Sequence, residues 1–144
     1  MANYISFTRS NYFRVTDPEA FKKIINRVIT DEDSLELWER TENGTTYYGF
    51  GAYSSICGLR HEAEDVDNDG EFEVEAVYEA LSKVVAPDDA IIITEIGYEK
   101  LRYLTAYAMV ITREKTELVE LREASIDAAC SLLGNPNFDT RMEY

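Results

Sequence analysis

The sequence predicts an α+β domain in which a mostly antiparallel sheet is built from hairpins and about three helices pack on it, in the order β(β)αββαβββα. Ala90 to Leu121 is a nearly uninterrupted apolar run with two short polar connections, enough for three strands. Asn43-Gly44 separates two strand-like segments and fits a type I′ turn. Consecutive hairpins favour antiparallel pairing. At 144 residues, the whole chain, 1–144, is predicted to form a single globular domain.

The first third of the chain is predicted to hold a strand and a helix. Residues 3–15 are rich in aromatic and β-branched side chains, which favours a strand, with a break near Arg9-Ser10-Asn11. Thr16 or Asp17 can cap the following helix, and proline suits its first position. Apolar residues recur at helical spacing, so the helix is predicted to run from Pro18 to Ile29.

The middle third is predicted to hold a hairpin, a loop and a second helix. The hairpin pairs Leu35–Thr41 with Thr45–Tyr53 across the Asn43-Gly44 turn. Residues 54–70 are predicted to be a loop that ends in an acidic run. Valine, tyrosine and leucine recur at helical spacing after it, which predicts a helix over Glu71–Val85.

The last third is predicted to hold the three central strands and a third helix over Glu123–Leu133. The apolar residues of this helix that we expect to face inward are Ile126, Ala129, Cys130 and Leu133. Gly134 is expected to end the helix in a left-handed conformation, with Pro136 just beyond it. The last eight residues are expected to form a loosely docked tail.

Charge is the most unusual property of the sequence. The net charge is −14, and residues 30–95 hold eighteen acids against three bases. A field of this sign repels nucleic acid and anionic membranes and favours basic partners or cations. The simpler explanation is that the acidic residues only keep the protein soluble.

The predicted contact surface lies in this acidic third. Nine acids and no lysine or arginine occur between His61 and Ser82, so the loop and helix can imitate the charge layout of a nucleic-acid backbone. The simpler alternative is a solvated helix face. A second, smaller candidate is the charged connection Tyr98–Tyr103, which can also be a plain turn. The predicted partner-binding residues are Glu62, Glu64, Asp65, Asp67, Asp69, Glu71, Glu75, Glu79, Lys100 and Arg102.

A calcium site is the alternative function for the acidic loop. Asp65, Asp67, Asp69 and Gly70 match the opening of a calcium-binding loop, which needs oxygen ligands at alternate positions and a glycine at the sixth. The match fails at the twelfth position, where Ala76 stands in place of a bidentate glutamate. A solvated acidic loop is therefore the favoured interpretation, and we expect no cofactor apart from the calcium of this alternative.

Catalytic motifs are nearly absent, which favours a non-enzymatic protein. His61 is the only histidine, and Cys57 four residues before it could place a thiol near an imidazole, but two ligands do not make a zinc site. No serine lies in a G-x-S-x-G context. The sequence also lacks a signal-peptide pattern and an apolar run long enough to span a membrane. With two cysteines only, we expect free thiols in the cytoplasm.

Two stretches carry a resemblance to known sequences. Ser10–Asp17 (SNYFRVTD) and Glu95–Tyr107 (EIGYEKLRYLTAY) resemble small acidic proteins of phages, plasmids and conjugative elements, a group without an established activity. No residue role transfers from that group. The resemblance implies a setting, an accessory protein of a mobile element, in which acidic inhibitors of host restriction or CRISPR nucleases are a familiar class.

The leading interpretation is thus a cytoplasmic accessory protein that binds a basic surface of another protein, with no direct binding to nucleic acid or membrane. Specifically, we expect that it mimics nucleic acid and inhibits a host nuclease. A structural homo-oligomer is the third alternative, because ten tyrosines, many of them on predicted strands, could form an interface.

Overall fold

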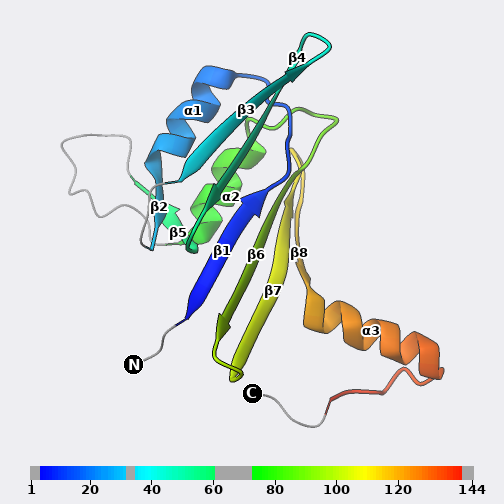
Figure 1. Cartoon of the computed structure of the whole chain (residues 1–144). Helices are drawn as coiled ribbons and strands as arrows, with labels where there is room; N and C mark the ends of the chain where they lie inside the picture. The colour runs from blue at the N-terminus through cyan, green and yellow to red at the C-terminus, as the bar shows by residue number, and fades with distance from the viewer. Residues whose placement is uncertain (1–3, 32–34, 61–72, 141–144) are drawn as a thin grey trace.

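The structure is a computed structural model that describes residues 4–31, 35–60 and 73–140. Within these ranges, eight strands and three helices form the α+β fold that the sequence predicts (Figure 1). The strands are β1 Ile5–Ser10, β2 Val28–Thr30, β3 Glu36–Glu42, β4 Thr45–Ala52, β5 Ile56–Leu59, β6 Ile91–Glu99, β7 Tyr103–Ile111 and β8 Thr116–Glu120. The helices are α1 Pro18–Arg27, α2 Val74–Ser82 and α3 Leu121–Leu133.

Six of the strands form one sheet in the order β3-β4-β1-β6-β7-β8, and each neighbouring pair is antiparallel. The predicted hairpins β3–β4 and β6–β7 are confirmed. Asn43 and Gly44 have φ angles of 52° and 79°, as a type I′ turn requires. None of the helices described by the structure is long and apolar enough to cross a membrane.

A second, two-stranded sheet was not predicted. Helix α1 ends at Arg27, two residues earlier than predicted, because Val28 adopts an extended conformation and pairs with Leu59. Val28–Thr30 is therefore strand β2. The partner strand, β5, lies in residues 54–70, which the sequence predicted to be a loop, so that prediction is wrong for Ile56–Leu59. Helix α2 is also shorter than predicted. It ends at Ser82 because Val85 forms a β-bridge with Val15.

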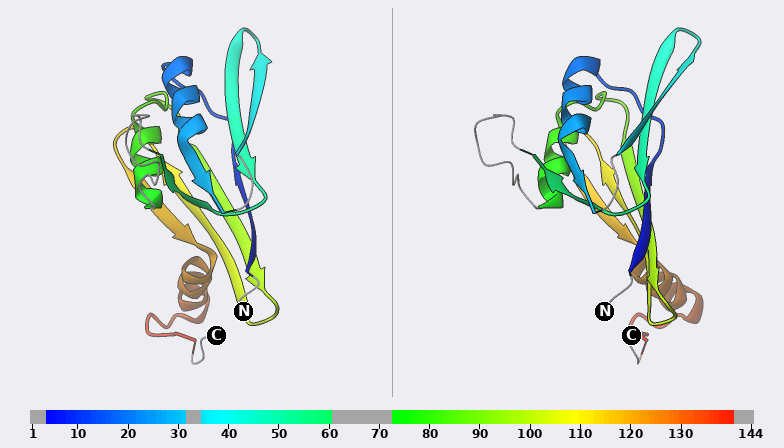
Figure 2. Two further views of the ribbon diagram at one scale, coloured as in Figure 1. Left: turned by 90° about the vertical axis from the view of Figure 1, so that its left-hand side faces the viewer. Right: turned by 60° about the vertical axis from the view of Figure 1, so that its left-hand side comes forward.

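The core lies between one side of the six-stranded sheet and helices α1 and α2, and Figure 2 shows these two helices together on that side. We call this the inner side of the sheet and the opposite one the outer side. Asp17 caps α1 as predicted, since its side chain accepts hydrogen bonds from the Glu19 and Ala20 N–H groups. The largest fully buried side chains of the core are Phe13, Phe21, Phe50, Leu81, Ile91, Ile111, Val77 and Val85.

Helix α3 does not belong to this core. It extends from the end of β8, beyond the sheet, and none of its thirteen residues is buried (Figure 1). Of the residues expected to face inward, Ile126, Ala129 and Cys130 are half-buried, but Leu133 is 63% exposed and the prediction for it is wrong. Gly134 ends the helix with φ 63°, as predicted. Residues 135–140 then return along the helix, and Arg122 of α3 donates a hydrogen bond to the Thr140 hydroxyl (2.9 Å).

Candidate functional site

The structure divides the predicted contact residues into two groups that lie apart. Glu75 and Glu79 are on α2, whereas Lys100 and Arg102 are at the tip of the β6–β7 hairpin, at the end of the sheet next to α3 (Figure 1). The sequence predicted two candidate surfaces, but not where they lie relative to each other. The other predicted residues lie outside the described part of the chain: Glu62, Glu64, Asp65, Asp67, Asp69 and Glu71.

Helix α2 holds its glutamates toward solvent. Val77, Tyr78 and Leu81 are buried against the core, which fixes the rotation of the helix and leaves Glu75 and Glu79 exposed. These two carboxylates are four residues apart, about 6 Å along the helix axis. Lys83 reaches Glu79 at 3.9 Å, an exposed ion pair that offsets part of its charge and adds little stability. The described part of the acidic third therefore presents two adjacent carboxylates on a rigid element.

A basic hollow borders this acidic side. It lies between α1 and α2, has a volume of about 480 Å³, and includes Glu79 in its lining. The Arg27 Nε atom donates a hydrogen bond to the Arg60 carbonyl oxygen (2.9 Å), which holds one wall of the hollow in place. The basic residues that line it are Lys23, Arg27, Arg60 and Lys83. These bases lie beside the acidic helix and balance part of its charge within the fold.

The second predicted surface adjoins an apolar hollow. Lys100 has φ 51°, a left-handed conformation that closes the tight β6–β7 turn, and Arg102 lies 5.6 Å from the ring centre of Tyr103. Lys100 lines an open hollow of about 1090 Å³ between the outer side of the sheet and the start of α3. Its apolar lining includes Ile96, Tyr98, Leu101, Leu104, Ala106 and Leu121. The sequence predicted contact through charge here, whereas the structure shows a mostly apolar surface with charges at its edge.

A buried carboxylate is the site that sequence reasoning missed. Glu95 is 8% exposed on the inner side of β6, where it accepts a hydrogen bond from the Tyr4 hydroxyl (3.1 Å) and from Tyr107, its pairing partner on β7. A signal was present in the sequence, since Glu95 is the one acid in Ile91–Gly97, where every other residue except Thr94 is apolar or glycine. Nearby small polar side chains also point inward from β1: Ser6, Thr8 and Ser10.

The tyrosines around Glu95 remain protonated at neutral pH. Burial raises the pKa of Tyr78 to about 12, and the negative charge of Glu95 adds to the effect. Burial and the same carboxylate also raise the pKa of Tyr107. Neutral phenols are hydrogen-bond donors and not bases, so the Tyr4 and Tyr107 hydroxyls stabilise the Glu95 carboxylate and do not abstract protons. The arrangement is that of a satisfied polar cluster in the core.

The Tyr78 phenol makes the fold sensitive to alkaline pH. Because its folded-state pKa of about 12 exceeds the ordinary value of 10.0, the unfolded chain loses the proton first, and stability present below pH 10 is lost as pH rises toward 12. Two pKa units correspond to about 2.7 kcal/mol of unfolding free energy, which solvent screening reduces. Between pH 10 and pH 12 the free energy of unfolding should therefore fall by about 1–2 kcal/mol less in Tyr78→Phe than in the wild type. Urea unfolding at a series of pH values measures this. Tyr53→Phe, which removes an exposed hydroxyl, should follow the wild-type curve.

The Cys57 thiol is not set up as a nucleophile. Burial, together with its hydrogen bond to the Asp31 carboxylate (2.9 Å), raises the pKa of Cys57 to about 11. A thiol with this pKa is almost entirely protonated at neutral pH, whereas the thiolate is the reactive form. The possible partner His61 lies outside the described residues. The geometry around Cys57 therefore supports a structural role for this thiol.

Metal ligands are not grouped in the described ranges, which contain no cluster of three or more histidine, cysteine, aspartate or glutamate side chains able to hold an ion. The predicted calcium ligands Asp65, Asp67 and Asp69 fall outside these ranges, so the calcium alternative stays a prediction.

Comparisons of the chain with family models, with curated proteins and with solved structures found no match.

Proposed function

We propose that the chain is a non-enzymatic accessory protein that binds a basic surface of another protein through its acidic middle third and so competes with nucleic acid for that surface. The observation that carries this proposal is the exposed pair Glu75 and Glu79 on α2, presented by a helix whose other side is anchored in the core. Because the helix backbone is already fixed by its packing, only the side chains of the pair must be ordered on binding, which favours its use as a contact.

The charge of the chain supports the same proposal. The excess of acids is concentrated in residues 30–95, with eighteen acids and three bases, while the whole chain carries −14. Such a field accelerates the encounter with a basic groove and opposes the approach of nucleic acid to the protein itself. The resemblance of residues 10–17 and 95–107 to proteins of mobile elements favours a host restriction or CRISPR nuclease as the partner.

Displacement of labelled DNA from purified nucleases tests the proposal. A panel of restriction and CRISPR nucleases is loaded with a fluorescent duplex, and the protein is added at low and at high salt. We expect the wild type to displace the duplex from at least one nuclease, and to do so less at high salt, because exposed charges are screened over about 8 Å at physiological ionic strength. In Glu75→Lys/Glu79→Lys, displacement should weaken on the order of 100-fold.

A variant with the same change in net charge separates a local surface from a general field. Glu36→Lys/Glu42→Lys reverses two exposed glutamates on β3 and leaves α2 intact. It should retain most of the displacement, because the contacting carboxylates remain. Equal loss in both double variants would mean that net charge alone is responsible, and a wild type that displaces nothing across the panel would contradict the nuclease proposal.

A further inference from the structure

The outer side of the sheet is apolar and exposed over three neighbouring strands, β1, β6 and β7. The strand register places Phe7 of β1 beside Ile96 of β6 and Ile96 beside Ala106 of β7. Tyr53 extends this row beyond β1, where its ring meets that of Phe7 at 6.1 Å. A second row joins Ile5, Tyr98 and Leu104. Large side chains in both rows are 44–64% exposed, which is unusual for two adjoining rows of a sheet.

This surface also avoids the charge that dominates the rest of the chain. The outward residues of β1, β6, β7 and β8, all within the described ranges, include one base, Arg9, and one acid, Glu117. Two molecules of net charge −14 repel each other at most orientations. The outer side is where two such molecules can approach with the least opposition between like charges.

Helix α3 carries a matching uncharged stripe. Leu121, Ser125, Ala128 and Leu132 recur along one side of the helix at intervals of three or four residues. Leu121 and Ser125 line the apolar hollow, and the stripe continues past it to Leu132, which is 88% exposed. A thirteen-residue helix without buried side chains gains little from its own chain, and isolated helices of this length are marginal in water. The stripe therefore lacks the packing that ordinarily stabilises such a helix.

We propose that a second copy of this chain packs on the outer side, related by a twofold axis, with the α3 stripe of each copy covering the exposed rows of the other. One chain supplies both complementary parts, a flat apolar surface and an overhanging helix, so a twofold axis satisfies both at once. The exposed apolar side chains amount to on the order of 1,000 Å², while a standard interface buries about 800 Å² per partner. This inference does not depend on the proposed function, since α1 and α2 stay exposed on both ends of such a dimer.

Sedimentation equilibrium measures the association directly. The wild type is expected to have twice the chain mass of 16.5 kDa at micromolar concentration. Leu104→Glu on β7 and Leu132→Glu on α3 each place a charge in the interface, and each should weaken dimerisation about 100-fold or more. Both positions are largely exposed in a single copy, so circular dichroism should show unchanged secondary structure.

Asn26→Glu provides the matched control, because it adds the same charge at an exposed position of α1, on the opposite side of the sheet. This variant should dimerise like the wild type. A wild type that remains a single chain at concentrations up to about 100 µM would overturn the inference, since it would bind itself more weakly than about 10⁻⁴ M. Dimers that persist in the Leu104→Glu/Leu132→Glu double variant would overturn it as well, because the interface would lie elsewhere.

Discussion

Replacing Phe13 with alanine should lower the free energy of unfolding by about 3–5 kcal/mol, the usual range for a fully buried phenylalanine. Phe13 is 0% exposed, and its ring packs edge to face against Phe21 (5.4 Å) and Phe50 (6.0 Å). Its backbone also joins the hairpin, through two hydrogen bonds with Tyr48 of 2.9 and 2.8 Å. The shortened side chain leaves a cavity where α1 meets the sheet, and a domain of this size is only about 5–15 kcal/mol stable.

Phe7→Ala is the matched control for Phe13→Ala. Phe7 lies six residues earlier but on the outer side, where it is 49% exposed and contacts Tyr53. At concentrations below dimerisation its replacement should cost about 1 kcal/mol or less, since half of the ring is already in water. Chemical denaturation of both variants provides the measurement. Equal losses would contradict the assignment of inner and outer sides, on which the proposed dimer also depends.

Features determined by neighbouring residues could be predicted from the sequence. The cap at Asp17, the turn at Asn43-Gly44 and the helix end at Gly134 each depend on residues within one turn of the chain. An aspartate just before a helix is well suited to accept hydrogen bonds from the free N–H groups, and glycine or asparagine is well suited to a position with positive φ, so these features can be recognised locally. The hairpin pairing followed from the turn, and with it the antiparallel character of the sheet.

Features determined by distant residues could not be predicted. Strand β2 exists because Val28 pairs with Leu59, and strands of three and four residues carry too short a pattern to recognise. Strand β6 has apolar residues on both of its sides. The sequence therefore indicated a buried strand, but not which of its two sides the helices would cover. The periodicity of α3 likewise predicted an inward side, although the helix finds no core in its own chain.

The same limit applies to the candidate site. Acidic residues on α2 could be predicted to face solvent, because a buried stripe leaves the charged positions outside. The buried Glu95 and the apolar hollow beside α3 depend on strand register and on where a helix leaves the sheet. The buried Glu95 has a usable signal in the sequence, a single acid in an apolar strand. The apolar hollow follows only from the arrangement of β6, β7 and α3 in space.

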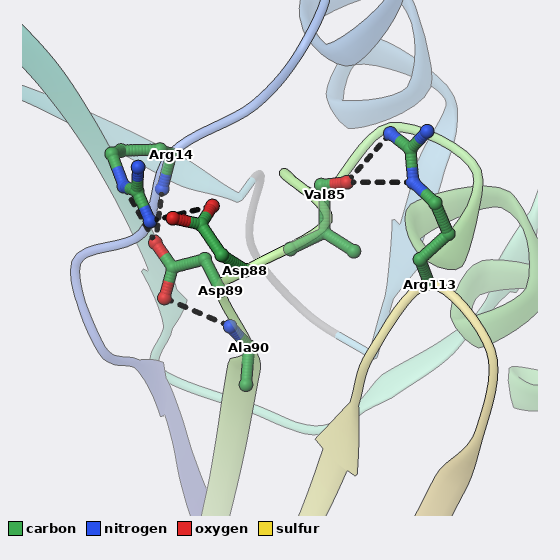
Figure 3. Close-up of polar contacts among 6 residues, drawn as sticks. All are labelled: Arg14, Val85, Asp88, Asp89, Ala90 and Arg113. Carbon is green, nitrogen blue, oxygen red and sulfur yellow. Dashed lines mark hydrogen bonds and ion pairs between the residues drawn. The ribbon is translucent and has the colours of Figure 1, made fainter.

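Asp89→Ala should be the most damaging replacement of a polar side chain, with an expected loss of about 2–3 kcal/mol. The carboxylate lies where the connection after α2 enters β6, and it is tied to the segment before α1 (Figure 3). One oxygen accepts hydrogen bonds from the Arg14 N–H (2.8 Å) and Nε (3.4 Å), and the other from the Ala90 N–H (2.8 Å). Removal leaves two backbone donors without partners, in a site that is only partly accessible to water.

The neighbouring residue separates hydrogen bonding from charge. Asp88 also pairs with Arg14, at 2.9 Å, but its side chain is 73% exposed and it contacts the guanidinium rather than the backbone N–H of Arg14 (Figure 3). Exposed pairs contribute about 0–1 kcal/mol, so Asp88→Ala should change the free energy of unfolding little, although both variants remove the same charge next to the same arginine. Denaturant unfolding at low and at high salt distinguishes the two contributions. The effect of Asp89→Ala should persist at high salt, because salt does not screen the hydrogen bonds to backbone N–H groups. Similar losses of stability in both variants that disappear at high salt would contradict this, since they would show that charge holds the connection.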